Sequence, residues 1–267
     1  MKLLRLLVAG SLAVAASGAI AQTASADDHT ATVSVLHGVP GATVDVYANG
    51  DELLKDFAPG TLTDPQQLPA GEYDLKVVAA GAGADGEAVI EANDVTVPAG
   101  ANITVVAHLK ADGTPVLTPF VNDTAASAEG ARLTVRHVAA APEVDVRAGG
   151  SAVVSGLANP EEAKLDLAAA TVSADVVAAG TDTVVLGPAD VTLTEGNNTI
   201  VYAWGSLEDE NLALAVQTVG IGDHAGLPST GVADEPVPTA PIAFAVGVVA
   251  IVAAVAGRVV LRSRVRA

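Results

Sequence analysis

The 267-residue sequence contains no cysteine, which excludes disulfides, thiolate catalysis and cysteine-based metal sites. Aromatic residues make up only 3% of the chain, and small residues such as alanine, valine, glycine and threonine dominate. This composition favours thin β-domains with small side chains over an enzyme with a deep, aromatic-lined pocket. Basic residues are also scarce, because 13 Lys and Arg stand against 31 Asp and Glu.

The amino terminus has the pattern of a secretory signal peptide, predicted over residues 1–26. Two basic residues precede an apolar run, and small residues follow at Ala24 and Ala26. Signal peptidase needs small residues at these two positions, so we expect the mature chain to begin at Asp27.

The carboxyl terminus has the pattern of a single membrane span. The mostly apolar stretch 242–261 would form a helix roughly 30 Å long, enough to cross a bilayer. The tail 262–267 is rich in arginine, which the positive-inside rule places on the cytoplasmic side. Everything before the span would therefore lie outside the cell.

The exported part is strongly acidic. Residues 27–230 keep 7 of the 13 basic and 29 of the 31 acidic residues, which gives a net charge of about −22. Such a surface repels nucleic acid and anionic lipid, so we expect no nucleic-acid partner. The charge either keeps the domain soluble or attracts cations or basic partners.

A pentapeptide lies shortly before the span: Leu227, Pro228, Ser229, Thr230 and Gly231. With the apolar stretch and the basic tail, it resembles the L-P-x-T-G cell-wall sorting signal of Gram-positive surface proteins. The resemblance implies that a sortase cuts after Thr230 and joins its carboxyl group to peptidoglycan, so that membrane insertion is transient. The alternative is a plain single-span anchor.

The middle of the chain is a tandem duplication. The segment Val33–His37 returns as Leu133–His137, and Val44–Gly50 returns as Val144–Gly150, both displaced by 100 positions. A repeat of this size is typical of two small globular modules. We therefore divide the exported part into a first module (27–121), a linker (122–130), a second module (131–220) and a stalk (221–241).

Each module has the alternating pattern of β-strands, separated by turns such as Asn49-Gly50. Because Asn-Gly after an alternating run is a strong hairpin signal, the fold class predicted is all-β, with two tandem immunoglobulin-like antiparallel β-sandwiches. Only residues 160–162 of the second module indicate a helical turn in place of a strand. We expect the two modules to form a rod of two beads on a flexible stalk.

Three segments carry a family resemblance: His37 with Pro40, then Val44–Gly50, then Leu68–Tyr73. Their H-x-x-P, V-D-V-Y-x-x-G and L-P-A-G-x-Y patterns resemble the bacterial family named domain of unknown function 4397. The resemblance covers both repeats and is weaker in the second, where Arg147 replaces tyrosine. It implies an immunoglobulin-like sandwich, often in tandem and in envelope proteins, with no agreed biochemical activity.

Two histidines recur at equivalent places, His37 and His137, each followed eight residues later by Asp45 or Asp145. A His/Asp pair can act as a proton shuttle or as half of a metal site. The simpler interpretation, which we favour, is that each imidazole bonds a neighbouring loop or that aspartate and fixes the first strand to the second.

Two acidic clusters on turns, Asp51-Glu52 and Glu208–Asn211, offer oxygen ligands, but neither has the spacing of a calcium loop. We interpret both as solvated loop charge. Tyr202 and Trp204 share one face of a strand. They can form a sugar-stacking platform, although core or inter-domain packing is the stronger prediction.

No nucleophile, base and orienter occur at a recognisable spacing, so we predict no catalytic residues and no cofactor. The leading hypothesis is a non-enzymatic, wall-anchored surface protein whose modules serve as a spacer, adhesion or interaction element. Its partners would be sortase, peptidoglycan and an unidentified extracellular ligand. The alternative is a surface module that binds a glycan, a cation or a basic protein, and a secreted hydrolase comes third.

Overall fold

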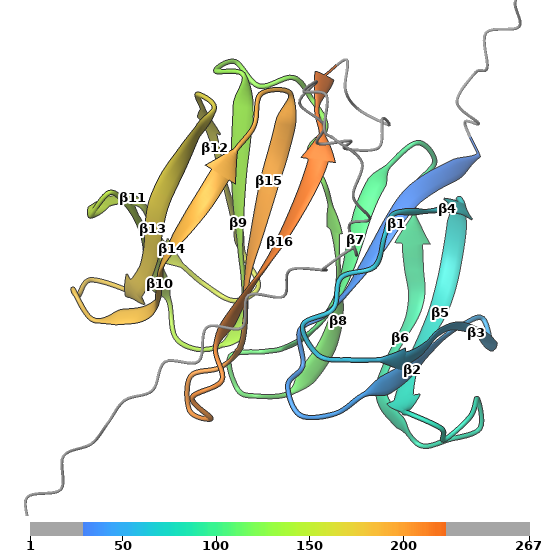
Figure 1. Cartoon of the computed structure of the whole chain (residues 1–267). Coiled ribbons are helices and arrows are strands. Elements are labelled where there is room, and N and C mark those ends of the chain that lie inside the picture. Colours follow the sequence, from blue (N-terminus) through green and yellow to red (C-terminus); the bar gives the residue numbers. More distant parts are fainter. Residues whose placement is uncertain (1–28, 223–267) are drawn as a thin grey trace, which may run out of the picture.

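The computed structural model describes residues 29–222 (Figure 1). The predicted signal peptide, the sorting motif 227–231 and the predicted span 242–261 lie outside these residues. Within the described part, no helix is long and apolar enough to cross a membrane.

The first module consists of two four-stranded sheets. One sheet has the order β4-β1-β7-β8 and the other has the order β3-β2-β5-β6. Strands β1 and β7 are parallel, and all other neighbours are antiparallel. The strands are β1 (Thr30–His37), β2 (Val44–Ala48), β3 (Asp51–Phe57), β4 (Gln66–Pro69), β5 (Gly71–Ala79), β6 (Ala88–Val97), β7 (Asn102–Leu109) and β8 (Pro115–Val121).

The second module repeats this topology. Its sheets have the orders β12-β9-β15-β16 and β11-β10-β13-β14, and β9 runs parallel to β15. Each strand thus corresponds to the strand eight places earlier. The strands are β9 (Ala131–Ala140), β10 (Val144–Ala148), β11 (Ser151–Leu157), β12 (Glu162–Leu167), β13 (Ala170–Ala178), β14 (Val184–Leu193), β15 (Asn197–Ser206) and β16 (Ala213–Gly220).

The prediction of two all-β sandwiches is confirmed. In each module, inward-facing valine, leucine and isoleucine side chains from both sheets form one core. The Asn49-Gly50 hairpin is also confirmed, because these residues have φ angles of 53° and 87°, and a type I′ turn needs positive φ at both positions.

The predicted helical turn at 160–162 is wrong. Strand β12 begins at Glu162 and pairs with β9 in the place that β4 occupies in the first module. Its sequence alternates charged residues with Ala163, Leu165 and Leu167, and these three pack against the core of the second module. A period of two buries one face of a strand but not of a helix, which explains why this segment is extended.

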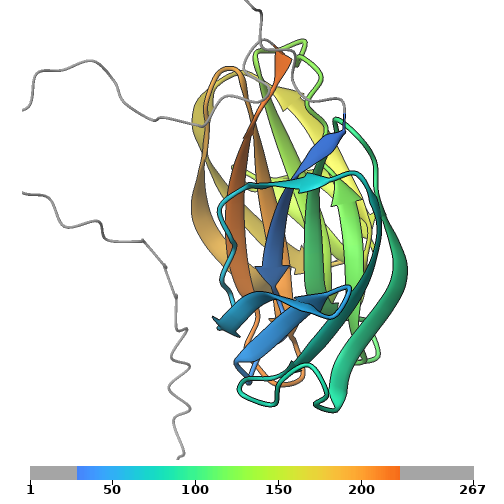
Figure 2. The same ribbon diagram turned by 90° about the vertical axis from the view of Figure 1, so that its right-hand side faces the viewer.

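The predicted rod of two beads is also wrong, because the modules lie side by side (Figure 1). Sheet β4-β1-β7-β8 of the first module packs face to face on sheet β12-β9-β15-β16 of the second, through a third apolar cluster. Figure 2 views the pair from the side of the first module, whose strands lie in front of those of the second. The cluster consists of Leu36, Val106, Phe120, Val138, Ile200, Tyr202 and Val219.

Candidate functional site

The recurring histidine of the first module holds a loop. His37 is 2% exposed, and its Nε2 lies 2.9 Å from the carbonyl oxygen of Ala42. Its Nδ1 accepts a hydrogen bond from the Val39 N–H at 3.4 Å, so Nε2 carries the proton and donates to Ala42. The ring stacks on Phe57 with 5.6 Å between the ring centroids. Burial lowers the pKa of His37, which keeps the imidazole neutral.

His137 repeats this arrangement in the second module. Its Nε2 lies 2.9 Å from the carbonyl oxygen of Pro142, and its Nδ1 faces the Ala139 N–H at 3.5 Å. Burial again lowers the pKa of His137. With both ring nitrogens engaged by backbone groups, neither histidine presents a free lone pair to a metal ion or a substrate. The loop-holding interpretation is therefore confirmed.

The aspartates that follow them hold other loops. The Asp45 carboxylate accepts the N–H groups of Asp56 and Gly81, both at 2.8 Å. Asp145 accepts those of Gly156 and Gly180, at 2.8 and 2.9 Å. These backbone bonds lower the pKa of both aspartates, since they stabilise the ionised form. The histidine and the aspartate of each module thus act on separate loops and not as a pair.

The two acidic clusters lie on turns. Asp51-Glu52 begins β3, and Glu208–Asn211 lies between β15 and β16. Within residues 29–222, no group of three histidine, aspartate or glutamate side chains is placed to hold a metal ion. The structure brings no further oxygen ligand to either cluster that would form such a group.

Tyr202 and Trp204 pack between the modules, which confirms the packing interpretation. Tyr202 is completely buried. Trp204 lies against the first module so closely that a Cβ on Gly60 would be 2.9 Å from its ring, and one on Gly38 would be 3.2 Å from its Cβ atom. A buried tyrosine and a covered tryptophan face leave no platform on which a sugar ring could stack.

A buried arginine, which the sequence analysis did not single out, is the centre of the seam between the modules. Arg136, on β9, has no exposed side-chain surface. Its Nη1 donates to Asn122 Oδ1 at 2.9 Å and to the Tyr202 hydroxyl at 2.8 Å. Its Nε donates to Glu162 at 2.9 Å, and its guanidinium lies 4.5 Å from the centroid of the Phe120 ring. Since Phe120 and Asn122 belong to the first-module side, Arg136 connects both modules.

Further hydrogen bonds extend this seam. The Tyr202 hydroxyl donates to Gln217 Oε1 at 2.6 Å, and Thr104 of the first module donates to the same oxygen at 2.9 Å. Asn159 donates to the carbonyl oxygens of Leu109 and Ala139, one from each module. Burial raises the pKa of the Tyr202 phenol, so the hydroxyl remains protonated and available as a donor.

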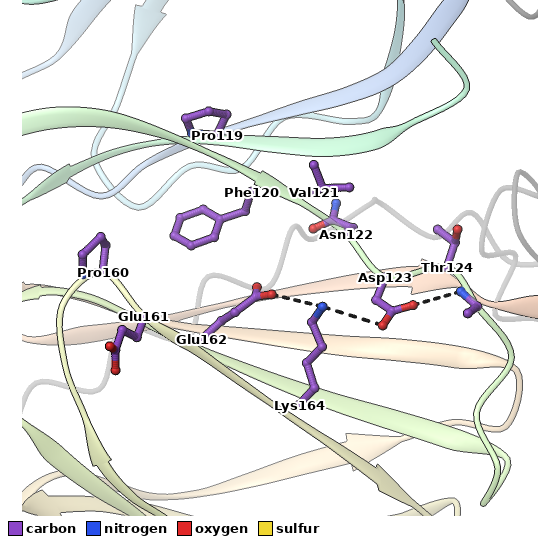
Figure 3. A pocket seen from close by; sticks show the side chains of 11 residues that line it. Pro119, Phe120, Val121, Asn122, Asp123, Thr124, Pro160, Glu161, Glu162 and Lys164 are labelled. Carbon is purple, nitrogen blue, oxygen red and sulfur yellow. Dashed lines mark hydrogen bonds and ion pairs between the residues drawn. The ribbon is translucent and has the colours of Figure 1, made fainter. Parts of the chain in front are cut away.

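A shallow groove of about 980 Å³ opens along the seam between β8 and β12 (Figure 3). Lys164 lies between two carboxylates on its wall, 3.1 Å from Glu162 and 3.6 Å from Asp123. Arg132 reaches Asp123 at 2.9 Å. Three of the seven basic residues of 27–230 thus lie at this seam, and their charges balance those of the carboxylates that line it. Because these charges cancel, the residues of the groove hold the two modules together and do not attract a free ion.

One known protein family matches the first module and the start of the second. Residues 31–147 match the family described as Domain of unknown function (DUF4397). The chain carries a DUF4397 domain. The match spans the first module and continues through β9 and β10 of the second, and it ends where Arg147 replaces the tyrosine of the first repeat. No curated protein matches the chain significantly.

Proposed function

We propose that this protein is a non-enzymatic surface protein of a Gram-positive cell, attached by sortase through Thr230 to peptidoglycan. The observation that carries the proposal is the order of patterns in the sequence: a signal-peptide pattern, a duplicated region that contains the DUF4397 match, a pentapeptide like the sorting signal, an apolar stretch and a basic tail. An interaction role for the pair agrees with the absence of a catalytic constellation in the sequence.

The distance from the folded pair to the attachment point favours interaction over spacing. Thr230 follows Gly222, the last described residue, by eight positions. A fully extended chain spans at most about 3.6 Å per residue, so this tether reaches no more than about 30 Å. Because the modules pack side by side, the pair also extends less far than two modules joined end to end. The proposed protein therefore holds a broad acidic surface close to the wall.

Cell fractionation tests the attachment. Muramidase should release the wild-type protein, whereas detergent alone should not. The Thr230→Ala variant keeps the apolar stretch but loses the residue that sortase joins to the wall, so detergent should extract it. Release of the wild-type protein by detergent without muramidase would contradict covalent attachment and leave the single-span anchor.

Among the alternative ligands, a basic protein is favoured over a glycan. The net charge of about −22 attracts cationic segments, and the tyrosine and tryptophan suited to stacking on a sugar are packed in the seam. Binding of polylysine that weakens as salt is raised, together with no signal on a glycan array, would support this choice. The reverse pattern would favour the glycan.

A further inference from the structure

The four sheets have eight edge strands, and seven of them carry a device that prevents pairing with another chain. Exposed edges attract extended chains, and proteins protect them with proline, charge, bulges or short length. Strand β4 is four residues long; β8 contains Pro115 and Pro119; β14 contains Pro188; β3, β6 and β12 carry charged residues; and β11 has register shifts against β10.

Strand β16 has none of these devices. Its eight residues, Ala213–Gly220, include no proline and no charged side chain. Its register against β15 is unbroken from Gly220 to Ala213. Val216 near its centre is 55% exposed. Strand β16 is therefore the unprotected edge of the described part of the molecule.

The equivalent strand of the first module, β8, carries a proline that β16 lacks. Asn102 corresponds to Asn198, because these residues pair with Thr32 and Arg132, which are 100 positions apart. The register from these anchors places Pro119 of β8 at the position of Val216 in β16. A proline stands on the edge of one module where an exposed valine stands in the other.

The backbone of Val216 faces outward. Ile221 donates its N–H to Gly196 across the β15–β16 ladder, and hydrogen-bonding direction alternates along an antiparallel strand. The N–H and C=O groups of Leu214, Val216 and Thr218 therefore point to the free edge. The facing sheet also covers this edge less, because β6 packs along β8, whereas its counterpart β14, beyond its sheet neighbour β13, contacts β15 and β9.

The negative charge at one end of β16 indicates which kind of peptide segment the edge would bind. The turn before Ala213 holds Glu208, Asp209 and Glu210, all exposed. None of the three forms an ion pair within residues 29–222. A strand added antiparallel to β16 would place its carboxyl end beside these carboxylates. A second copy of this acidic protein would instead meet like charge.

We propose that the free edge of β16 binds an extended basic peptide segment by strand addition, in antiparallel orientation, with its basic residues toward Glu208–Glu210. The backbone groups of Leu214, Val216 and Thr218 supply the pairing, and the turn supplies charge selectivity. The inference deepens the proposed interaction role and rests on it. Cell fractionation tests wall attachment separately, so failure of peptide binding would leave attachment standing.

The test uses the full chain in detergent and fluorescence anisotropy with a labelled probe. The probe is a short peptide of alternating valine and threonine that ends in a run of lysines. The Val216→Pro variant removes one outward N–H and should weaken binding about tenfold or more. Because that N–H makes no bond within the sheet, the variant should keep its melting temperature; Val216→Lys serves as a second edge variant if it does not. Val216→Thr is the matched control and should bind as the wild type.

Two further probes test direction and charge. A peptide with its lysines moved to the amino end should bind more weakly, and one with glutamates in their place should not bind. Protection of the Val216 and Thr218 amides from hydrogen exchange should appear only with the first peptide. Equal binding by wild type and both edge variants would overturn the proposal. So would a dimer of the wild-type chain that Val216→Pro abolishes, since the occupant would then be a second copy.

Discussion

The two modules share one topology but differ in the strands that meet at the seam. In the first module, the outer face of β1 carries Leu36, which is fully buried against the second module. At the corresponding place on β9, the second module carries Arg136, which is equally buried and reaches back to the first module. At this position the first module thus supplies an apolar side chain, while the second supplies a charged one that bonds Asn122 across the seam.

This difference indicates a division of roles after duplication. The family match covers the first module and ends early in the second. The second module contains the seam arginine, the seam tyrosine and the unprotected edge β16. The first keeps the family motifs and a proline-protected edge. The repeated histidine and aspartate, in contrast, are the same in both modules, and they hold equivalent loops in each.

The largest expected effect comes from removing the seam arginine. Arg136→Ala leaves Asn122 and Glu162 without their buried partner, and we expect it to lower the free energy of unfolding by about 3–5 kcal/mol. Urea denaturation of the full chain measures this loss. Arg147→Ala is the matched control in the same module, because Arg147 pairs with Asp175 at a partly exposed site.

The control should cost less, about 1–2 kcal/mol, because its bidentate pair with Asp175 keeps partial contact with solvent. Losses of similar size for the two variants would contradict the central role of Arg136 in the seam. A separate early unfolding transition of one module in Arg136→Ala alone would strengthen it.

The sandwich fold could be predicted because alternation and turn residues are local signals, and each module repeats them. The seam could not, because a strand with polar residues on its outer face usually faces solvent. Arg136 lies on such a face, and its burial depends on Phe120 and Asn122 of the first-module side and on Tyr202, which no local pattern brings to it. One signal was available: apolar Leu36 and Val106 also lie on outer faces, where they need a cover. The second-module strand at Glu162 was missed because its prolyl start resembles that of a helix.

An intermediate effect is expected at the seam hydroxyl. Tyr202→Phe removes the acceptor for Arg136 and the donor to Gln217, both buried. We expect a loss of about 1–3 kcal/mol in the free energy of unfolding. Tyr47→Phe in the first module is the control, because its hydroxyl makes only a long, 3.4 Å bond to Glu52. Equal losses would mean that the seam hydroxyl contributes no more than a hydroxyl with one long hydrogen bond.

The smallest expected effect is a dependence of the free energy of unfolding on pH. Buried histidines cause it, and within residues 29–222 the first module has one more of them than the second. Burial lowers the folded-state pKa of His37, His108 and His137 below the ordinary value of 6.5. The unfolded chain therefore binds more protons as pH falls through 6.5, so stability is full above that pH and declines below it until the folded-state pKa values are reached.

His108 distinguishes the modules because Trp204 stands at its position in the second. Its Nδ1 faces the carbonyl oxygen of Leu109 at 3.0 Å and its Nε2 faces Thr118 at 2.8 Å. Burial is the main cause of its lowered pKa, and the nearby His137 and Lys110 lower it further. Each buried neutral histidine contributes a slope of up to about 1.4 kcal/mol per pH unit. His108→Gln should reduce the slope of unfolding free energy between pH 6.5 and 5, whatever it does to stability at neutral pH. An unchanged slope would mean that His108 takes up a proton in the folded protein as readily as in the unfolded chain, and the seam would then tolerate a buried charge on the first module as it does at Arg136 on the second.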